Sequence, residues 1–170
     1  MIMTNANVNT MTSQNQLTED EKLELYTEDF IADNTTHQEV IETVISSLQQ
    51  NDSAMVSHTD QAYLWKFQYG TVEVFVQLTG ENDEDLLTVW ASVLKFPAKD
   101  ESGLMRKLLE MNWSDTFETR FALINDEVVV LHQRTVADLA PGEISRAITL
   151  VATIADDNDE ILVEQFGASR

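Results

Sequence analysis

The sequence predicts an α+β fold, and two observations carry this prediction. The spacing of apolar residues changes repeatedly between the period of a helix and the two-residue period of a strand. Gly, Pro, Asn and Asp stand at most of these changes, where the chain is expected to turn or to end an element. We therefore expect an antiparallel sheet of about five strands with helices packed on one side, in the order α-βββ-α-ββ-α.

Three stretches have helical spacing. The first starts at Thr36, which forms a capping-box pattern with Glu39. Its apolar face is Val40, Ile41, Val44, Ile45 and Leu48. The second is capped by Asp100 or Ser102. Its expected buried side chains are Leu104, Met105, Leu108, Leu109 and, as an open choice, Met111. The third runs from Pro141 to Gly167, and the "DDND" step at 156–159 leaves open whether it is one helix or two.

Five stretches are expected to be strands. "YLWKFQY" at 63–69 and the stretch from Val72 to Leu78 alternate apolar and polar residues around a turn at Gly70. "LLTVWASVLKF" at 86–96 is apolar on both faces, which is typical of a central strand, and Pro97 ends it. The last two strands form a hairpin around a two-residue turn at Asn125–Asp126. In that hairpin four side chains are expected to pack inward: Phe121, Leu123, Val128 and Val130.

The chain divides into three parts by composition. Residues 1–16 are polar and without periodicity, so we expect a disordered tail. Residues 17–35 form an acidic extension that is expected to be a short helix or a docking segment. Residues 36–170 contain all the strands and the long helices, and they are expected to fold as a single α+β domain.

Charge and composition exclude several classes of function. Ten basic and thirty acidic residues give a formal charge of −20, which repels both nucleic acid and anionic membrane surfaces. No apolar run approaches the roughly 20 residues that span a bilayer. Without cysteine there is no disulfide framework and no thiolate zinc site. The expected protein is cytoplasmic and binds neither nucleic acid nor membranes.

No motif for catalysis or for a cofactor is present. The histidines have no metal-ligand spacing, and the glycines form no phosphate-binding loop. The acidic clusters fail the calcium-loop pattern, since position 6 after Asp156 is Ile161 rather than Gly. The weak metal candidates that remain are Asp156, Asp157, Asp159 and Glu160. We therefore expect no enzyme activity and no cofactor.

Aromatic residues on the strands are the candidates for protein contact. Tyr63 and Trp65 alternate on one strand, and Trp90 lies on the central strand. Such side chains most simply fill a sheet's buried face, but their polar ends also suit an interface. We expect partner binding at Tyr63, Trp65 and Trp90, and self-contact through the last helix or the face with Trp90.

The segments "LMRKLLEMNW", "RFALINDEVVVLHQRTV" and "LAPGEISRAITLVATIADDNDEILVEQFG", in this order, resemble the YbjN family, and its cyanobacterial branch in particular. The resemblance covers residues 36–167. That family shares the fold of type III secretion chaperones, so the resemblance implies a curved antiparallel sheet with helices on one side, often in a dimer. It also implies a role in regulation or stress responses and supplies no catalytic residues.

These expectations combine into one leading hypothesis. The protein is a non-enzymatic interaction module, chaperone-like or regulatory, that acts as a homodimer and binds a protein partner. The alternative is an acidic regulatory protein that responds to a divalent cation, Ca²⁺. A hydrolase would need a concave pocket with convergent titratable groups.

Overall fold

The computed structural model describes residues 35–59 and 62–167. The tail expected at 1–16 and the acidic extension expected at 17–35 therefore lie outside the described residues, apart from Thr35. The fold below is that of the unit that starts at Thr36.

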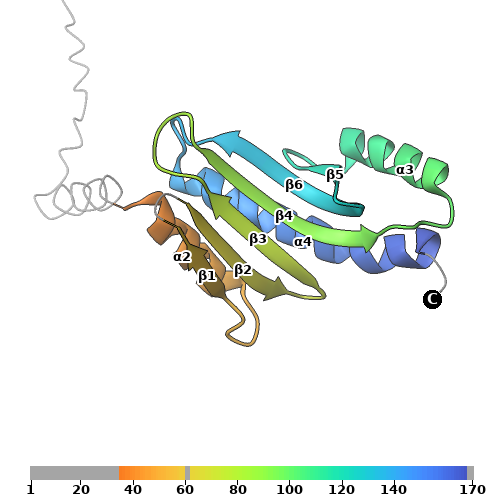
Figure 1. Cartoon of the computed structure of the whole chain (residues 1–170), viewed down its shortest axis with the longest axis horizontal. Coiled ribbons are helices and arrows are strands. Elements are labelled where there is room, and N and C mark those ends of the chain that lie inside the picture. Colours follow the sequence, from red (N-terminus) through yellow and green to blue (C-terminus); the bar gives the residue numbers. More distant parts are fainter. Residues whose placement is uncertain (1–34, 60–61, 168–170) are drawn as a thin grey trace, which may run out of the picture. The chain divides into compact units, whose positions relative to one another are not determined.

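The described residues of this unit form three helices and six strands (Figure 1). In chain order they are α2 (His37–Leu48), β1 (Met55–His58), β2 (Tyr63–Tyr69), β3 (Val72–Leu78), β4 (Leu86–Lys95), α3 (Glu101–Ser114), β5 (Arg120–Ile124), β6 (Glu127–Thr135) and α4 (Pro141–Phe166). The strands form one antiparallel sheet in the order β1-β2-β3-β4-β6-β5. The predicted α+β class is confirmed, and β4 is central as expected.

The predicted strand count of about five omitted β1. All four residues of β1 are exposed, and the strand pairs with β2 at the edge of the sheet. A strand that buries neither face leaves no alternation of apolar and polar residues to read.

Local sequence signals set the helix starts. Thr36 accepts a hydrogen bond from the backbone of Glu39 at 3.2 Å, and Glu39 accepts one from the backbone of Thr36 at 2.9 Å, so the predicted capping box is formed. Asp100 caps α3 by accepting from the backbone N–H of Gly103 at 2.9 Å. Pro141 occupies the first turn of α4, which runs unbroken through the "DDND" step. None of the helices in the described part of the chain combines the length and apolar character needed to cross a bilayer.

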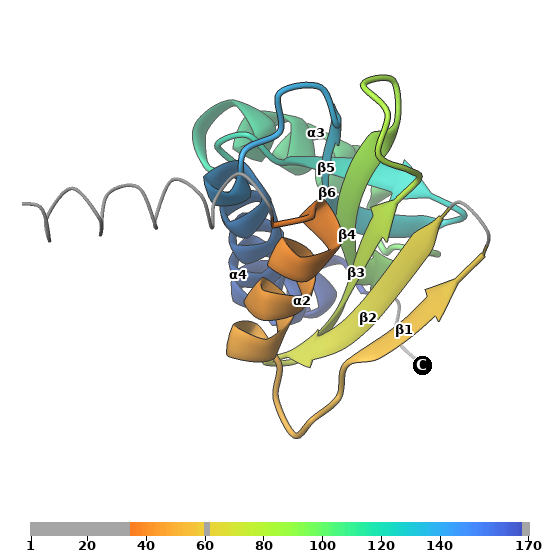
Figure 2. The ribbon, with the colours of Figure 1, turned by 90° about the vertical axis from the view of Figure 1, so that its left-hand side faces the viewer.

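One face of the sheet carries the core. α4 lies across this face against β2, β3, β4 and β6, and α2 packs beside it (Figure 2). Alternate residues of β3 point toward the helices and are buried: Val72, Val74, Val76 and Leu78. A fully buried side chain of this size contributes about 1.5–3 kcal/mol, so this layer stabilises much of the fold. α3 instead lies against β5 at the far edge.

The predicted hairpin is confirmed in its turn and register. Asn125 and Asp126 have φ of 50° and 61°, the left-handed values that a two-residue turn of this kind needs. Phe121 pairs with Val130 and Leu123 with Val128. The expected inward packing is wrong for Leu123, which is 54% exposed near the end of the edge strand β5, beside the turn at Asn125–Asp126.

Candidate protein-interaction surface

Helix α3 has an apolar side that the described residues leave uncovered. Leu104 and Leu108 are one turn apart and face the core. Leu109 and Trp113 form a second pair with the same spacing, and they are 70% and 93% exposed. Leu109 was expected among the buried side chains of this helix, and that prediction is wrong. Residues adjacent in sequence on a helix are turned about 100° apart, so the contact that buries Leu108 leaves Leu109 outside.

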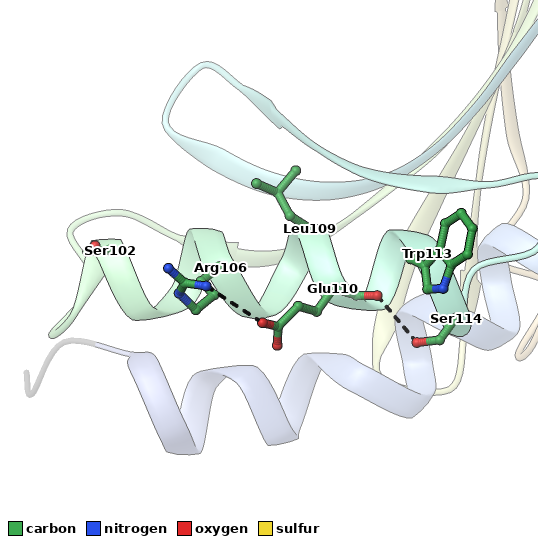
Figure 3. A pocket seen from close by; sticks show the side chains of 6 residues that line it. All are labelled: Ser102, Arg106, Leu109, Glu110, Trp113 and Ser114. Carbon is green, nitrogen blue, oxygen red and sulfur yellow. Dashed lines mark hydrogen bonds and ion pairs between the residues drawn. The ribbon is translucent and has the colours of Figure 1, made fainter.

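A shallow groove runs along this exposed side (Figure 3). It has a volume of about 690 Å³, and its lining residues are Ser102, Arg106, Leu109, Glu110, Trp113 and Ser114. Arg106 and Glu110 are one turn apart and form an ion pair at 4.0 Å, with both side chains largely in solvent. The groove therefore combines a large aromatic ring with a guanidinium that its own partner holds weakly.

Phe117 follows α3 in the chain and is a further exposed apolar side chain. Its φ is 51°, and among the described residues it is the one non-glycine residue with positive φ that is neither Asn nor Asp. A bulky side chain is strained in that conformation. Phe117 is also 75% exposed, so burial does not offset the strain. We call Leu109, Trp113 and Phe117, together with Arg106, the α3 surface.

The residues expected to bind a partner lie elsewhere. Trp65 is buried in the core, and Tyr63 is half-buried with its ring stacked on Trp65 at 5.4 Å. Trp90 is half-buried on the opposite face of the sheet, where its ring stacks on Phe75 at 5.2 Å. The three residues therefore do not form one surface.

Two of the four weak metal candidates hold a turn in place. Thr71, in the turn between β2 and β3, donates its backbone N–H to Asp156 at 2.7 Å. Its hydroxyl lies 2.9 Å from both Asp156 and Asp159. Asp157 and Glu160 are exposed. Within residues 35–59 and 62–167, no group of three or more His, Cys, Asp or Glu side chains is placed to hold a metal ion.

The acidic loop at 81–85 is likewise organised by its own hydrogen bonds. Asp85 accepts from the backbone N–H and the side chain of Asn82, at 2.9 and 3.0 Å, and from the hydroxyl of Thr79 at 3.1 Å. These bonds favour the charged carboxylate, the backbone bond most of all, and lower the pKa of Asp85. The loop thus needs no cation to fix its shape.

A small cavity of about 70 Å³ lies between β6, the start of α4 and the loop before β5. Its lining residues are Glu118, His132, Arg134, Glu143, Arg146, Ala147 and Leu150. Each arginine already has a carboxylate: Arg146 binds Glu118 through two hydrogen bonds of 2.8 and 3.0 Å, and Arg134 pairs with Glu143. The cavity has the volume of about two water molecules.

His132 is the one group in that cavity without a full set of partners. Its Nδ1 atom is buried and has no hydrogen-bond partner among the described residues. Burial lowers the pKa of His132, and Arg120 and Arg134 act in the same direction, while a hydrogen bond with the backbone of Glu118 acts against them. The lowered pKa favours the neutral imidazole. Among the described residues that line the cavity there is no Ser, Thr or Cys.

The fold and these surfaces define a small α+β protein with an exposed apolar side on helix α3. The model of the YbjN family, described as "Putative bacterial sensory transduction regulator", matches residues 37–164. The chain therefore belongs to the YbjN family. A search of curated proteins found no match.

Sequence reasoning missed the α3 surface because it treated every leucine of α3 as core. The signal was present in the spacing. Leu109 and Trp113 are four residues apart, on a line offset from Leu104 and Leu108, and Phe117 follows after the helix has ended at Ser114. A helix with two apolar lines cannot bury both of them in a single contact with the rest of the fold.

Proposed function

We propose that this protein is a regulatory module that acts by contacting other proteins rather than by catalysis, and that it works as a homodimer joined through the α3 surface. The observation that supports this most is the 93% exposure of Trp113 beside Leu109. Aromatic anchors are enriched in protein interfaces and dominate their binding energy. The family description as a regulator of sensory transduction agrees with this role.

The charge distribution favours a second copy as the occupant of the α3 surface. Residues 95–127 contain five of the ten basic residues and seven of the thirty acidic ones, a net charge of −2, whereas the rest of the chain carries −18. Two copies of so acidic a protein repel each other least where this stretch faces its equivalent. The expected self-contact at α4 would instead bring a more acidic segment together with its equivalent, since residues 141–166 contain six carboxylates and one arginine. The strand of Trp90, residues 86–95, contains one lysine and no carboxylate, so charge does not separate that face from the α3 surface.

A two-fold axis between Leu109 and Glu110 would set two α3 helices antiparallel. Trp113 of one copy then lies over Arg106 of the other, because both are equally far from the axis. A guanidinium over an indole ring is attracted by about 0.5–2 kcal/mol. The same axis brings Leu109 close to Leu109 of the other copy. The pairs of Trp113 with Arg106 then fill both ends of the groove, and the two leucines fill its centre.

Molecular mass in solution tests the homodimer. We expect the full chain to be dimeric in light scattering after size exclusion, and Trp113→Ala to weaken association by about 100-fold, the scale of an interface hot spot. Trp90→Thr is the matched control, since it removes the same ring from the other predicted surface. A monomeric wild-type protein at tens of micromolar would refute the homodimer. Dissociation by Trp90→Thr alone would move the interface to the sheet.

The calcium-responsive alternative stays a prediction. It requires calcium to raise the melting temperature and this rise to disappear when Asp156, Asp157, Asp159 and Glu160 are neutralised together. Asp156 and Asp159 already bind Thr71, so neutralising Asp157 and Glu160 alone separates cation binding from loss of that contact. An unchanged melting temperature at about millimolar calcium removes this alternative.

A further inference from the structure

Among the described residues, the outer edge of β1 is not paired with another strand. Thr59 donates its backbone N–H to the carbonyl of Ala62 at 2.9 Å, which marks a hydrogen-bonded pair of the β1–β2 hairpin. Such pairs alternate along an antiparallel ladder, so Ser57 and Met55 also point their backbone groups toward β2. Val56 and His58 therefore direct their N–H and C=O groups away from the sheet. Within the described part of the chain nothing binds those groups.

At the opposite edge of the sheet, formed by β5, outward backbone groups do have a hydrogen-bond partner. There Asn112 of α3 binds both the N–H and the C=O of Phe121, one of the two residues of β5 that face outward. A protected edge is the usual state, because a free edge invites pairing with other chains. β1 also lacks the lysine, proline or bulge that commonly blocks such pairing.

Side chains beside the β1 edge are placed to receive a partner. Val56, at 55% exposure, lies on the helix-facing side of the sheet, where it pairs with Trp65. The rings of His58, Tyr63 and Trp65 are stacked in series, with centroids 5.9 and 5.4 Å apart. α2 packs on α4, and β1 lies at the margin of the sheet, away from both helices (Figure 2).

Charge near β1 indicates what kind of chain would pair there. Residues 49–62, the stretch that contains β1 and the turns at its two ends, hold two carboxylates and no lysine or arginine. The first basic side chain beyond them, Lys66, is already paired with Glu73 at 2.6 Å. A second copy would bring the same negative charge to this edge, whereas a basic segment would be attracted.

We propose that β1 is a docking edge for an extended, basic segment of a partner protein, which adds a strand to the sheet. Main-chain hydrogen bonds to Val56 and His58 supply the pairing, and an apolar side chain beside Val56 supplies contact area. The inference deepens the proposed regulatory function by naming where its partner binds and the chemistry of that partner. It rests on that function but not on the dimer.

Proline substitutions test the backbone geometry directly. Val56→Pro removes an outward N–H, and an edge strand tolerates proline where the N–H faces solvent. Ser57→Pro is the matched contrast, since it removes an N–H that bonds β2, and it is expected to lower the melting temperature. Val56→Lys keeps the N–H but repels a basic segment, so the proposal can be tested even if Val56→Pro disturbs β1.

The probe is a short peptide that alternates lysine and valine, added to the full-length protein. We expect binding, slowed amide exchange at Val56 and His58, and weaker binding at higher salt. Val56→Pro and Val56→Lys are each expected to weaken binding by about tenfold or more, the equivalent of one lost interaction. A peptide that alternates glutamate and valine is expected not to bind.

Three results of the binding and exchange experiments would overturn the proposal. They are equal binding by wild type and both Val56 variants, unchanged exchange at Val56 and His58, and equal binding of the acidic peptide. An increase in mass that Val56→Pro abolishes would show self-pairing of β1 and would also overturn it. These readouts are independent of Trp113, so failure of the homodimer and failure of the docking edge can be told apart.

Discussion

The side chain of Asn112 completes the backbone hydrogen bonding of Phe121. Its Oδ1 accepts from the Phe121 N–H at 2.6 Å, and its Nδ2 donates to the Phe121 carbonyl at 3.2 Å. An amide side chain carries the same donor and acceptor as a peptide group, so α3 takes the place that a further strand would occupy beside β5. This pair fixes the helix that carries the α3 surface to the sheet.

Replacing Asn112 should therefore destabilise the fold and loosen α3. We expect Asn112→Leu to lower the free energy of unfolding by about 1–3 kcal/mol, because both backbone groups of Phe121 lose a partner. Asn112→Asp keeps the acceptor and loses the donor, so its cost should be intermediate. Urea unfolding followed by circular dichroism measures both. Identical midpoints for Asn112→Leu and the wild type would show that the pair is dispensable.

Features with a local cause could be predicted from the sequence. The capping box of Thr36 and Glu39, the turn at Asn125–Asp126 and the start of α4 at Pro141 each depend on residues a few positions apart. Their geometry follows from side-chain chemistry within one turn of chain. The long alternating strands were predicted for the same reason, since burial of one face leaves a two-residue period.

Features set by tertiary contact could not be predicted. The sequence does not say that α3 lies against β5 or that Leu104 and Leu108 are its buried pair, so it could not show that Leu109 faces solvent. Strand β1 was missed because it has no buried face to impose a pattern. The usual sequence signal of burial is absent at β1, whereas α3 carries it twice, as two apolar lines. These are the two surfaces that are proposed to bind proteins.

Phe117 should make the folded monomer less stable than an asparagine at the same position would. Asn adopts positive φ more readily, so Phe117→Asn should raise the free energy of unfolding of the monomer by about 1 kcal/mol, the lower end of such backbone strain. The same change should weaken the dimer, because it removes an exposed aromatic ring. Thermal unfolding at low protein concentration separates the two effects.

Phe117→Leu is the control for that experiment. It keeps an apolar side chain in the strained conformation, so both monomer stability and association should change little. A loss of monomer stability in Phe117→Asn would mean that the ring packs against its own monomer and is not available to a partner.

Thr71 should link the β2–β3 turn to α4. Thr71→Val removes the hydroxyl bonds to Asp156 and Asp159 and keeps the shape of the side chain. We expect a loss of about 1–2 kcal/mol in the free energy of unfolding, measured by urea titration. Asp157→Asn is the control, since this exposed carboxylate should contribute within about 0.5 kcal/mol. Equal effects of the two variants would contradict the structural role of Thr71.

The pH dependence of stability should carry a contribution from His132. Burial holds its pKa in the folded protein below the ordinary value of 6.5. As the pH falls through 6.5, the imidazole of His132 binds a proton in the unfolded chain while it stays neutral in the folded chain. The free energy of unfolding therefore falls. This loss continues until the pH reaches the lowered pKa of the folded state. Stability from this group is therefore complete above pH 6.5.

His132→Asn removes the titrating group, so the slope of stability against pH just below 6.5 should become flatter. His58→Asn makes the same substitution at an exposed histidine of β1 and serves as the control. Glu118 acts in a separate range: its bonds to Arg146 lower its pKa, so its contribution is lost only as the pH falls below 4.5. Urea unfolding at a series of pH values measures each slope. A His132→Asn protein with the full wild-type slope would show that burial of this imidazole does not govern stability in that range.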